Sequence, residues 1–236
     1  MNYAIILLAG EGKRMHSPIP KQFLRVRNVP VFIYTAKAFD SHPEIDGVLL
    51  VVHPDYLDDV SSIIKTFNLA KVKAIVAGGA TRQMSVFNGL DALLSFAQPN
   101  DIVLIHDAAR PLVSSRIITD NILATLSHGA AETVLETSDT LTFSSNGILL
   151  ESPLNRSHVY QVQTPQSFRY QLIHDAHLDM AKQKNHSLTD DAQAVHQMGA
   201  PVYLVRGDRF NFKITTPEDF ALFEAWVEKQ GRDTDD

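Results

Sequence analysis

Short apolar runs alternate with amphipathic stretches along the first half of the chain. An unbroken apolar run of about six residues predicts a strand covered on both faces, because such a strand needs no polar alternation. The predicted strands are 3–8, 47–52, 72–77 and 101–105. Between them, apolar side chains recur every three or four residues, which predicts helices packed against those strands. The predicted helices are 31–39, 56–67 and 82–96.

The second half continues with the same kinds of element. The predicted elements are helices 167–182 and 189–198, strands 201–205 and 211–214, and a last helix from Pro217. Thr216-Pro217-Glu218-Asp219 is typical of a helix start, with threonine as the cap, proline at the first position and acids in the first turn. Strands that alternate with helices pair in parallel through right-handed crossovers. We therefore expect an α/β fold with a mostly parallel, doubly wound, Rossmann-like sheet.

Residues 137–163 interrupt this alternation. Two β-like runs flank Asn146-Gly147, a dipeptide that favours a tight hairpin turn. The segment is predicted to be a hairpin arm that protrudes from a single domain over 1–230, with an ordinary edge hairpin as the alternative. A protruding arm is a candidate for homodimer formation. The polar tail, 231–236, is predicted to be disordered.

Loops that follow parallel strands meet at one edge of the sheet. Three loops, at 9–21, 78–85 and 106–111, each follow a predicted strand. Ligands of such folds bind outside the carboxyl ends of the strands. The three loops should therefore converge on one pocket.

Composition narrows the possible functions. The 236 residues contain no cysteine, which excludes disulfides, thiolate metal sites and cysteine nucleophiles. Asp and Glu outnumber Lys and Arg by 27 to 21, which argues against a general nucleic-acid binder. No apolar run approaches a membrane span of roughly 20 residues, and the first residues lack a basic signal region. We predict a cytoplasmic protein without nucleic-acid or membrane partners.

The loop after the first strand contains the clearest chemical signal. Two glycines in Ala9-Gly10-Glu11-Gly12 let backbone amides approach a phosphate closely, and Lys13, Arg14 and Lys21 add positive charge. A solvated glycine-rich turn is the alternative. A dinucleotide fingerprint would need glycine at Met15 and an acid near His53, and a P-loop would need glycine at position 7 and Ser or Thr at position 14.

Five motifs in order over nearly the whole chain carry a family resemblance. They are Gly10-x-Gly12-x-Arg14-Met15 with Pro20-Lys21-Gln22, Gly78-Gly79-x-x-Arg82-x-x-Ser85-Val86, His106-Asp107-Ala108-Ala109-Arg110-Pro111, Gln163-Thr164-Pro165-Gln166-x-Phe168 and Asn211-x-Lys213-Ile214-Thr215-x-Pro217-Glu218-Asp219. Together they resemble the CTP-dependent cytidylyltransferases of polyol phosphates. This family includes enzymes acting on methylerythritol phosphate and on ribitol phosphate.

The resemblance implies a reaction and a set of site residues. CTP and an alditol phosphate would give a CDP-alditol and pyrophosphate, with Mg²⁺ bridging the phosphates and Asp107 beside either the metal or the polyol. The implied catalytic cations are Arg14, Lys21 and Lys213. The implied nucleotide contacts are Ala9, Gly10, Gly12, Gly79, Ala80, Ser85 and Asp107. The implied polyol contacts are Asp107, Arg110, Thr140, Arg156 and Thr189, some of them from a neighbouring subunit.

The motifs favour one polyol over another. Tyr160 and its neighbours from Asn155 are more similar to the ribitol branch, whereas most other motifs are more similar to the methylerythritol branch, which serves isoprenoid precursor biosynthesis. We therefore expect 2-C-methyl-D-erythritol 4-phosphate as the acceptor, with D-ribitol 5-phosphate as the alternative. Met15 and His53 argue against a nicotinamide-dependent oxidoreductase. A catalytically silent binding module is disfavoured because every cation that the resemblance requires is present.

Overall fold

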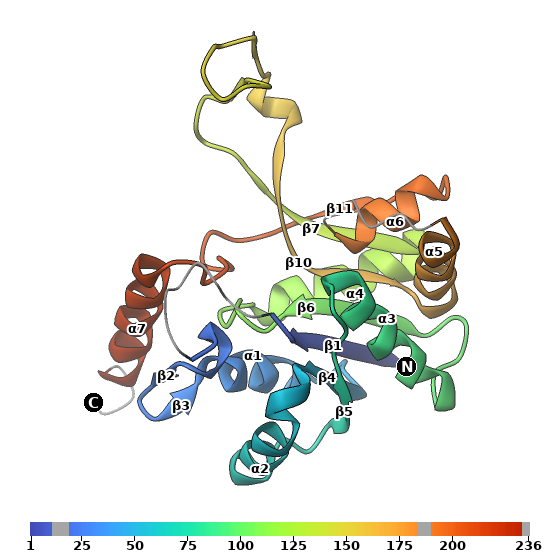
Figure 1. Cartoon of the computed structure of the whole chain (residues 1–236), viewed down its shortest axis with the longest axis vertical. Helices are drawn as coiled ribbons and strands as arrows, with labels where there is room; N and C mark the ends of the chain where they lie inside the picture. The colour runs from blue at the N-terminus through green and yellow to red at the C-terminus, as the bar shows by residue number, and fades with distance from the viewer. Residues whose placement is uncertain (11–18, 184–189, 233–236) are drawn as a thin grey trace.

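The computed structural model describes residues 1–10, 19–183 and 190–232, and its core is one seven-stranded sheet (Figure 1). The strand order is β11-β7-β10-β6-β1-β4-β5. The bounds are β1 Asn2–Leu8, β4 Gly47–Val52, β5 Val72–Ala77, β6 Ile102–Asp107, β7 Ala130–Glu136, β10 Tyr160–Arg169 and β11 Tyr203–Arg206. Only β10 runs antiparallel to its neighbours in this sheet of described residues. This confirms the predicted mostly parallel α/β sheet.

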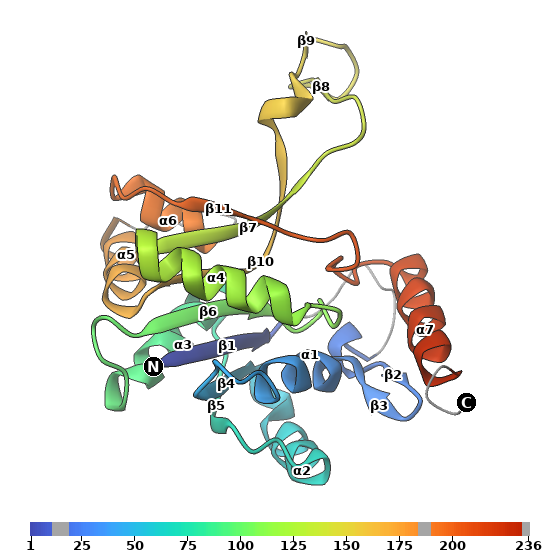
Figure 2. The same ribbon diagram turned by 180° about the vertical axis from the view of Figure 1, so that it is seen from behind.

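Helices cover both faces of the sheet, as Figures 1 and 2 show from opposite sides. One face packs against α1 (Val31–Asp40), α2 (Leu57–Phe67) and α4 (Ser115–His128). The other face packs against α3 (Arg82–Ala92), α5 (Tyr170–Gln183) and α6 (Asp191–Gln197). The central strands β1, β4 and β6 are almost wholly buried, as their unbroken apolar runs predict.

The last helix, α7 (Pro217–Arg232), lies apart from these two layers. It packs with Val26 and Val31 in a smaller apolar cluster near the carboxyl ends of the strands. The helix begins where the sequence predicts, and Asp219 N–H donates to the Thr216 hydroxyl at 3.4 Å. It continues to Arg232, two residues into the tail predicted to be disordered, and residues 233–236 lie outside the described residues.

Several short elements complete the chain. They are η2 Lys21–Phe23, β2 Arg25–Val26, β3 Val29–Pro30, η3 Pro54–Tyr56, η4 Leu93–Ser95, β8 Thr142–Phe143, β9 Ser152–Pro153 and η5 Arg156–His158. No helix of the described residues is both long enough and apolar enough to cross a membrane.

The structure corrects several of the elements expected from the sequence. Residues 167–169 belong to strand β10, not to a helix, and 211–214 form no strand. Helix α4 and strand β7 were not predicted. Strand β6 extends through Asp107, two residues beyond the predicted end at 105. The β10 error has a physical cause. Its buried polar side chains satisfy each other inside the core, as when Ser167 donates to Asn121 at 2.9 Å, so the strand lacks the apolar run expected of a buried one.

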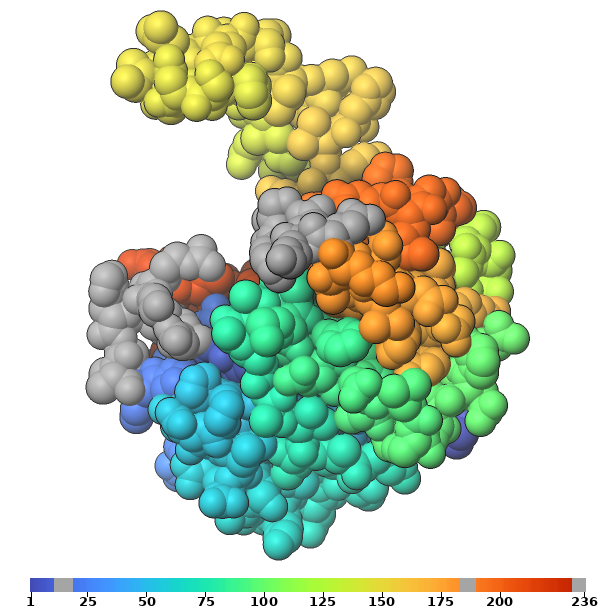
Figure 3. Space-filling view, turned by 45° about the vertical axis from the view of Figure 1, so that its right-hand side comes forward, coloured from blue at the N-terminus to red at the C-terminus, as the bar shows by residue number. Residues whose placement is uncertain are grey.

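The predicted hairpin does protrude from the domain. Residues 137–159 leave the sheet between β7 and β10 and form an arm, closed by the two-residue strands β8 and β9, that stands clear of the body (Figures 1 and 3). Its tip exposes three apolar side chains, Ile148, Leu149 and Leu150. Apolar residues gathered on a projecting arm are typical of a surface that another molecule covers.

Candidate active site

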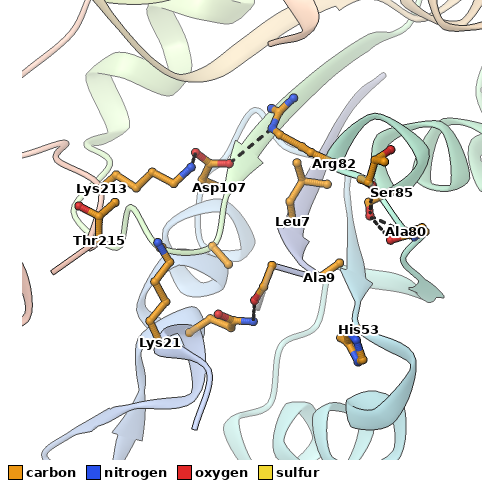
Figure 4. A pocket seen from close by; sticks show the side chains of 16 residues that line it. Leu7, Ala9, Lys21, His53, Ala80, Arg82, Ser85, Asp107, Lys213 and Thr215 are labelled. Atoms are coloured by element: carbon orange, nitrogen blue, oxygen red, sulfur yellow. Dashed lines mark hydrogen bonds and ion pairs between the residues drawn. The ribbon is translucent and has the colours of Figure 1, made fainter. Parts of the chain in front are cut away.

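The three predicted loops converge on one pocket of about 530 Å³ at the carboxyl ends of the strands (Figure 4). Its lining includes Leu7, Ala9, Gly10, Lys21, Gln22, His53, Gly79, Ala80, Thr81, Arg82, Ser85, Asp107, Ala108, Ala109, Lys213 and Thr215. The predicted convergence of loops is therefore confirmed for the described residues.

The candidate site residues fall into three groups. Eight of those named from the sequence line the pocket: Ala9, Gly10, Lys21, Gly79, Ala80, Ser85, Asp107 and Lys213. Three others, Gly12, Arg14 and Thr189, lie outside the described residues. The remaining three, Arg110, Thr140 and Arg156, do not line this pocket.

Gln22 fixes the loop that follows β1. Its buried side-chain amide donates to the Leu8 carbonyl at 2.7 Å and to the Gly10 carbonyl at 2.9 Å. A buried amide with satisfied hydrogen bonds holds two backbone segments together more firmly than an exposed one. The neighbouring Lys21 is thereby placed at the pocket, where its ammonium donates to the Ile214 carbonyl at 2.6 Å.

A serine and two glycines shape the loop between β5 and α3. The Ser85 hydroxyl donates to the Thr81 carbonyl at 2.9 Å and accepts from Gly79 N–H at 3.1 Å. A Cβ atom at Gly78 would lie 2.5 Å from the Ala9 Cβ, so only glycine fits there. The loop is thus packed directly against the end of β1. Ser85 is buried and braces this loop, in addition to the base contact expected of it.

Asp107, the last residue of β6, lies among three cations, two of which, Lys213 and Arg82, are shown in Figure 4. Its carboxylate is 2.8 Å from Lys213 Nζ, 3.7 Å from Arg110 Nε and 4.0 Å from Arg82 Nε. Burial alone would raise the pKa of Asp107, but Lys213, Arg82 and Arg110 together hold it well below its usual range. Asp107 is therefore ionised, and the cations around it outnumber it, which suits a pocket for anions.

Lys213 belongs to an extended segment fixed at both ends. Ile214 N–H donates to the Ala109 carbonyl at 2.8 Å, which ties the segment to the loop after β6. Asp219 accepts from the Thr215 and Thr216 amides at 2.8 and 2.9 Å, which ties it to α7. The Lys213 side chain therefore reaches the pocket from a braced backbone, although the segment is not the strand that was predicted.

Arg110 and His106 lie behind the pocket and support it. Arg110 is buried, and its Nη1 donates to the Asn211 carbonyl at 2.8 Å. His106 is fully buried beside Thr164, and burial lowers its pKa to about 4, so the ring is neutral near pH 7. A neutral, enclosed imidazole suits a structural role.

Thr140 and Arg156 both lie on the arm. Arg156 is exposed in η5 and donates to the Ser138 carbonyl of the same arm at 3.0 Å. The arm stands clear of the body, so these residues lie away from their own pocket (Figure 3).

Sequence reasoning missed the individual roles of Arg82 and Gln22. Both residues belong to the motifs that carry the family resemblance, but neither was predicted to be a site residue. Arg82 lines the pocket and bonds to Asp191, a residue 109 positions away, at 2.8 Å. A contact between residues so distant in sequence has no local signal in the pattern of the chain.

The described lining supplies little to hold a metal ion. Asp107 is its only carboxylate, and the described residues contain no group of three or more acidic or histidine side chains placed to bind a metal. The three cations around Asp107 would also repel a divalent ion. Magnesium is usually bound through one or two carboxylates together with substrate phosphates, so it would have to be held mainly by the phosphates.

Glu132 on β7 gives a prediction about pH and stability. Burial and the nearby Asp190 raise the pKa of Glu132 to about 7, although Gln166 donates to it at 2.6 Å. A raised folded-state pKa means that stability is highest below the unfolded value and is lost as pH rises through about 7. Glu132→Gln should therefore unfold about 2–4 °C higher than the unsubstituted protein at pH 8.5.

Comparing the two proteins at a second, acidic pH tests whether ionisation of Glu132 causes the difference in unfolding temperature. At pH 4.5 the two proteins should unfold at nearly the same temperature, because the wild-type carboxyl is then largely protonated in the folded state. Thermal unfolding followed by circular dichroism at both pH values measures the difference. An equal stabilisation at both values would show that packing, and not ionisation, is responsible.

Comparison with known proteins places the chain among cytidylyltransferases. The family model described as "IspD: 2-C-methyl-D-erythritol 4-phosphate cytidylyltransferase" matches residues 2–229. A protein of Clostridium botulinum (strain Okra / Type B1) named 2-C-methyl-D-erythritol 4-phosphate cytidylyltransferase is 44% identical over 229 residues, covering 97% of this chain and 98% of the relative.

Solved structures agree with the sequence relatives. The 4-diphosphocytidyl-2C-methyl-D-erythritol synthase of Anaerococcus prevotii superposes with a TM-score of 0.81 at 29% identity, over 96% of each chain. The 2-C-methyl-D-erythritol 4-phosphate cytidylyltransferase of Thermus thermophilus gives a TM-score of 0.75 at 33% identity, over 97% of this chain and 100% of that one.

Proposed function

This chain belongs to the family of 2-C-methyl-D-erythritol 4-phosphate cytidylyltransferases, and from that membership we propose that it transfers CMP from CTP to 2-C-methyl-D-erythritol 4-phosphate. The observation that carries the proposal is the near-complete match to relatives with this name, joined to a cation-rich pocket at the predicted place. The names of the relatives favour methylerythritol phosphate over ribitol phosphate, despite Tyr160.

The reaction joins two anions. An oxygen of the acceptor phosphate attacks the α-phosphorus of CTP, the bond from that phosphorus to the oxygen leading to the β-phosphate breaks, and pyrophosphate leaves with the electron pair. The main obstacle is charge repulsion, so positioning and neutralisation suffice for catalysis. Lys21 and Lys213 line the pocket from two separate segments of the chain and would stabilise the transition-state charge. Arg14 is proposed to join them.

The nucleotide and the acceptor have separate proposed contacts. The loop from Gly79 to Ser85, with Ala9 and Gly10, would hold the base and phosphates of CTP. Asp107 faces the space between the loops, and we propose that it accepts a hydrogen bond from a substrate hydroxyl. Mg²⁺ would enter with CTP as part of the substrate, because the described lining offers it one carboxylate that three cations already surround.

The arm supports the proposal of a homodimer. Thr140 and Arg156 would reach the acceptor in the neighbouring subunit's pocket, where arginine suits a phosphate because its planar fork donates two hydrogen bonds. The exposed apolar tip of the arm is consistent with a covered surface. A cytoplasmic location stays a prediction.

Pyrophosphate release tests the proposed reaction. The four nucleoside triphosphates should be crossed with 2-C-methyl-D-erythritol 4-phosphate, D-ribitol 5-phosphate and a hexose 1-phosphate, each with Mg²⁺. We expect release only from CTP with the methylerythritol phosphate. Faster release with ribitol phosphate would favour the other branch, and release without CTP would contradict the assignment.

A further inference from the structure

A buried ion-pair network lies beside the pocket, and none of the proposed substrate contacts belongs to it. Asp191, the first residue of α6, is only 1% exposed. One of its carboxylate oxygens accepts from Arg82 Nη2 at 2.8 Å, and the other lies 3.1 Å from His177 Nε2. Its backbone N–H donates to the Gln166 side chain at 3.0 Å, so its position is fixed from three sides.

Arg82 lies between two carboxylates and is bound to only one of them. Its Nη2 is hydrogen-bonded to Asp191, whereas its Nε is 4.0 Å from Asp107 Oδ1, beyond hydrogen-bond distance. Lys213 and Arg110 both approach the other oxygen of Asp107, Oδ2. Among the described residues, no side-chain hydrogen bond engages Asp107 Oδ1, the oxygen that faces Arg82.

We infer that Asp191 is a positioning residue: it holds Arg82 away from Asp107 and so keeps Asp107 Oδ1 available to a substrate hydroxyl. This inference rests on the proposed function. Two buried carboxylates compete for one guanidinium, and the more deeply buried Asp191, with its side chain 1% exposed against 12% for Asp107, wins because its surroundings strengthen the attraction. Without the negative charge of Asp191, Arg82 would close onto Asp107, the nearest remaining carboxylate.

The substitution Asp191→Asn removes that charge with little change of shape. Asparagine keeps an acceptor oxygen but carries no charge, so it holds Arg82 more weakly than the carboxylate does. Arg82 should then move to within about 3 Å of Asp107 Oδ1. We expect KM to rise about tenfold for the substrate whose hydroxyl Asp107 accepts, corresponding to the loss of one good hydrogen bond. Separate KM values for CTP and for the polyol phosphate identify that substrate.

A second substitution separates positioning from general damage. Adding Arg82→Gln to Asp191→Asn removes the group that would close onto Asp107, so the double variant should have a lower KM than Asp191→Asn alone. A purely structural role predicts no such recovery, provided that both proteins are measured well below their unfolding temperatures. A higher KM in the double variant would overturn the inference.

Asp190→Asn is the matched control. It removes one negative charge from the neighbouring residue, and asparagine can keep the helix-capping bond in which Asp190 accepts from Gln193 N–H. Its KM values should stay within about twofold of the wild type. An equal rise in the control would overturn the inference, because general charge near α6 would then be the cause.

Crystal structures give a test independent of activity. In Asp191→Asn, the distance from Arg82 to Asp107 Oδ1 should shorten to hydrogen-bond length, and an unchanged distance would overturn the inference. If the variant fails to fold, the wild-type complex with CTP and the polyol phosphate decides. Arg82 should stay on Asp191 while a substrate hydroxyl lies on Asp107 Oδ1. A wild type without pyrophosphate release would refute the proposed function, whereas the Asp191→Asn structure would still test the movement of Arg82.

Discussion

Lys213→Ala should lower kcat by about 10²–10³, because it removes a cation placed where charge develops in the transition state. The Lys213 ammonium lies 2.8 Å from Asp107 on a segment braced by Ala109 and Asp219. Lys21→Ala should have a similar effect, since Lys21 lines the same pocket. Steady-state pyrophosphate release at saturating CTP measures both.

A surface lysine provides the control for charge and expression. Lys65 is exposed on α2, away from the pocket lining, so Lys65→Ala should retain near-normal kcat. Thermal unfolding of all three variants verifies that they are folded at the assay temperature. If Lys21→Ala and Lys213→Ala both keep near-normal rates, the assignment of these lysines to the phosphates is wrong.

Mixing two inactive variants should restore activity if the arm completes a neighbouring pocket. Arg156→Ala removes the proposed acceptor contact of the arm, and Lys21→Ala removes a cation of the pocket. In a mixed dimer, one pocket then keeps its own Lys21 and receives an intact arm, while the other has neither. Random exchange of equal amounts makes half of the dimers mixed, so about one quarter of wild-type activity should return.

The arrangement of the arm makes this result specific. Arg156 is exposed on a hairpin that stands clear of its own body, so a contact within one chain would require the arm to fold back (Figure 3). A fluorescence-labelled pair of variants verifies that subunits have exchanged. Persistent inactivity after verified exchange would show that each subunit uses its own arm or none.

The positions of the central strands and the place of the pocket could be predicted because both depend on local patterns. Unbroken apolar runs mark β1, β4 and β6, and loops after parallel strands must meet at one edge of the sheet. The arm had its own local signal, Asn146-Gly147. Predicting these features does not require knowing which residues, distant in sequence, are in contact in the fold.

Other features depend on contacts between distant segments. Strand β10 carries Gln166 and Ser167 in the core, and only their partners on β7, α4 and α6 explain why such polar residues are buried there. The Arg82–Asp191 pair joins residues 109 positions apart, so motif spacing could name Arg82 without revealing what holds it. The candidate site residues Gly12, Arg14 and Thr189 stay predictions, since they lie outside the described residues.

A crystal structure with CTP and Mg²⁺ tests the central claim most directly, namely that the pocket at the carboxyl ends of β1 and β6 binds the nucleotide. We predict density for the cytosine against the loop from Gly79 to Ser85 and for the triphosphate beside Gly10 and Lys21. Triphosphate density elsewhere on the molecule, with this pocket filled only by solvent, would contradict the account.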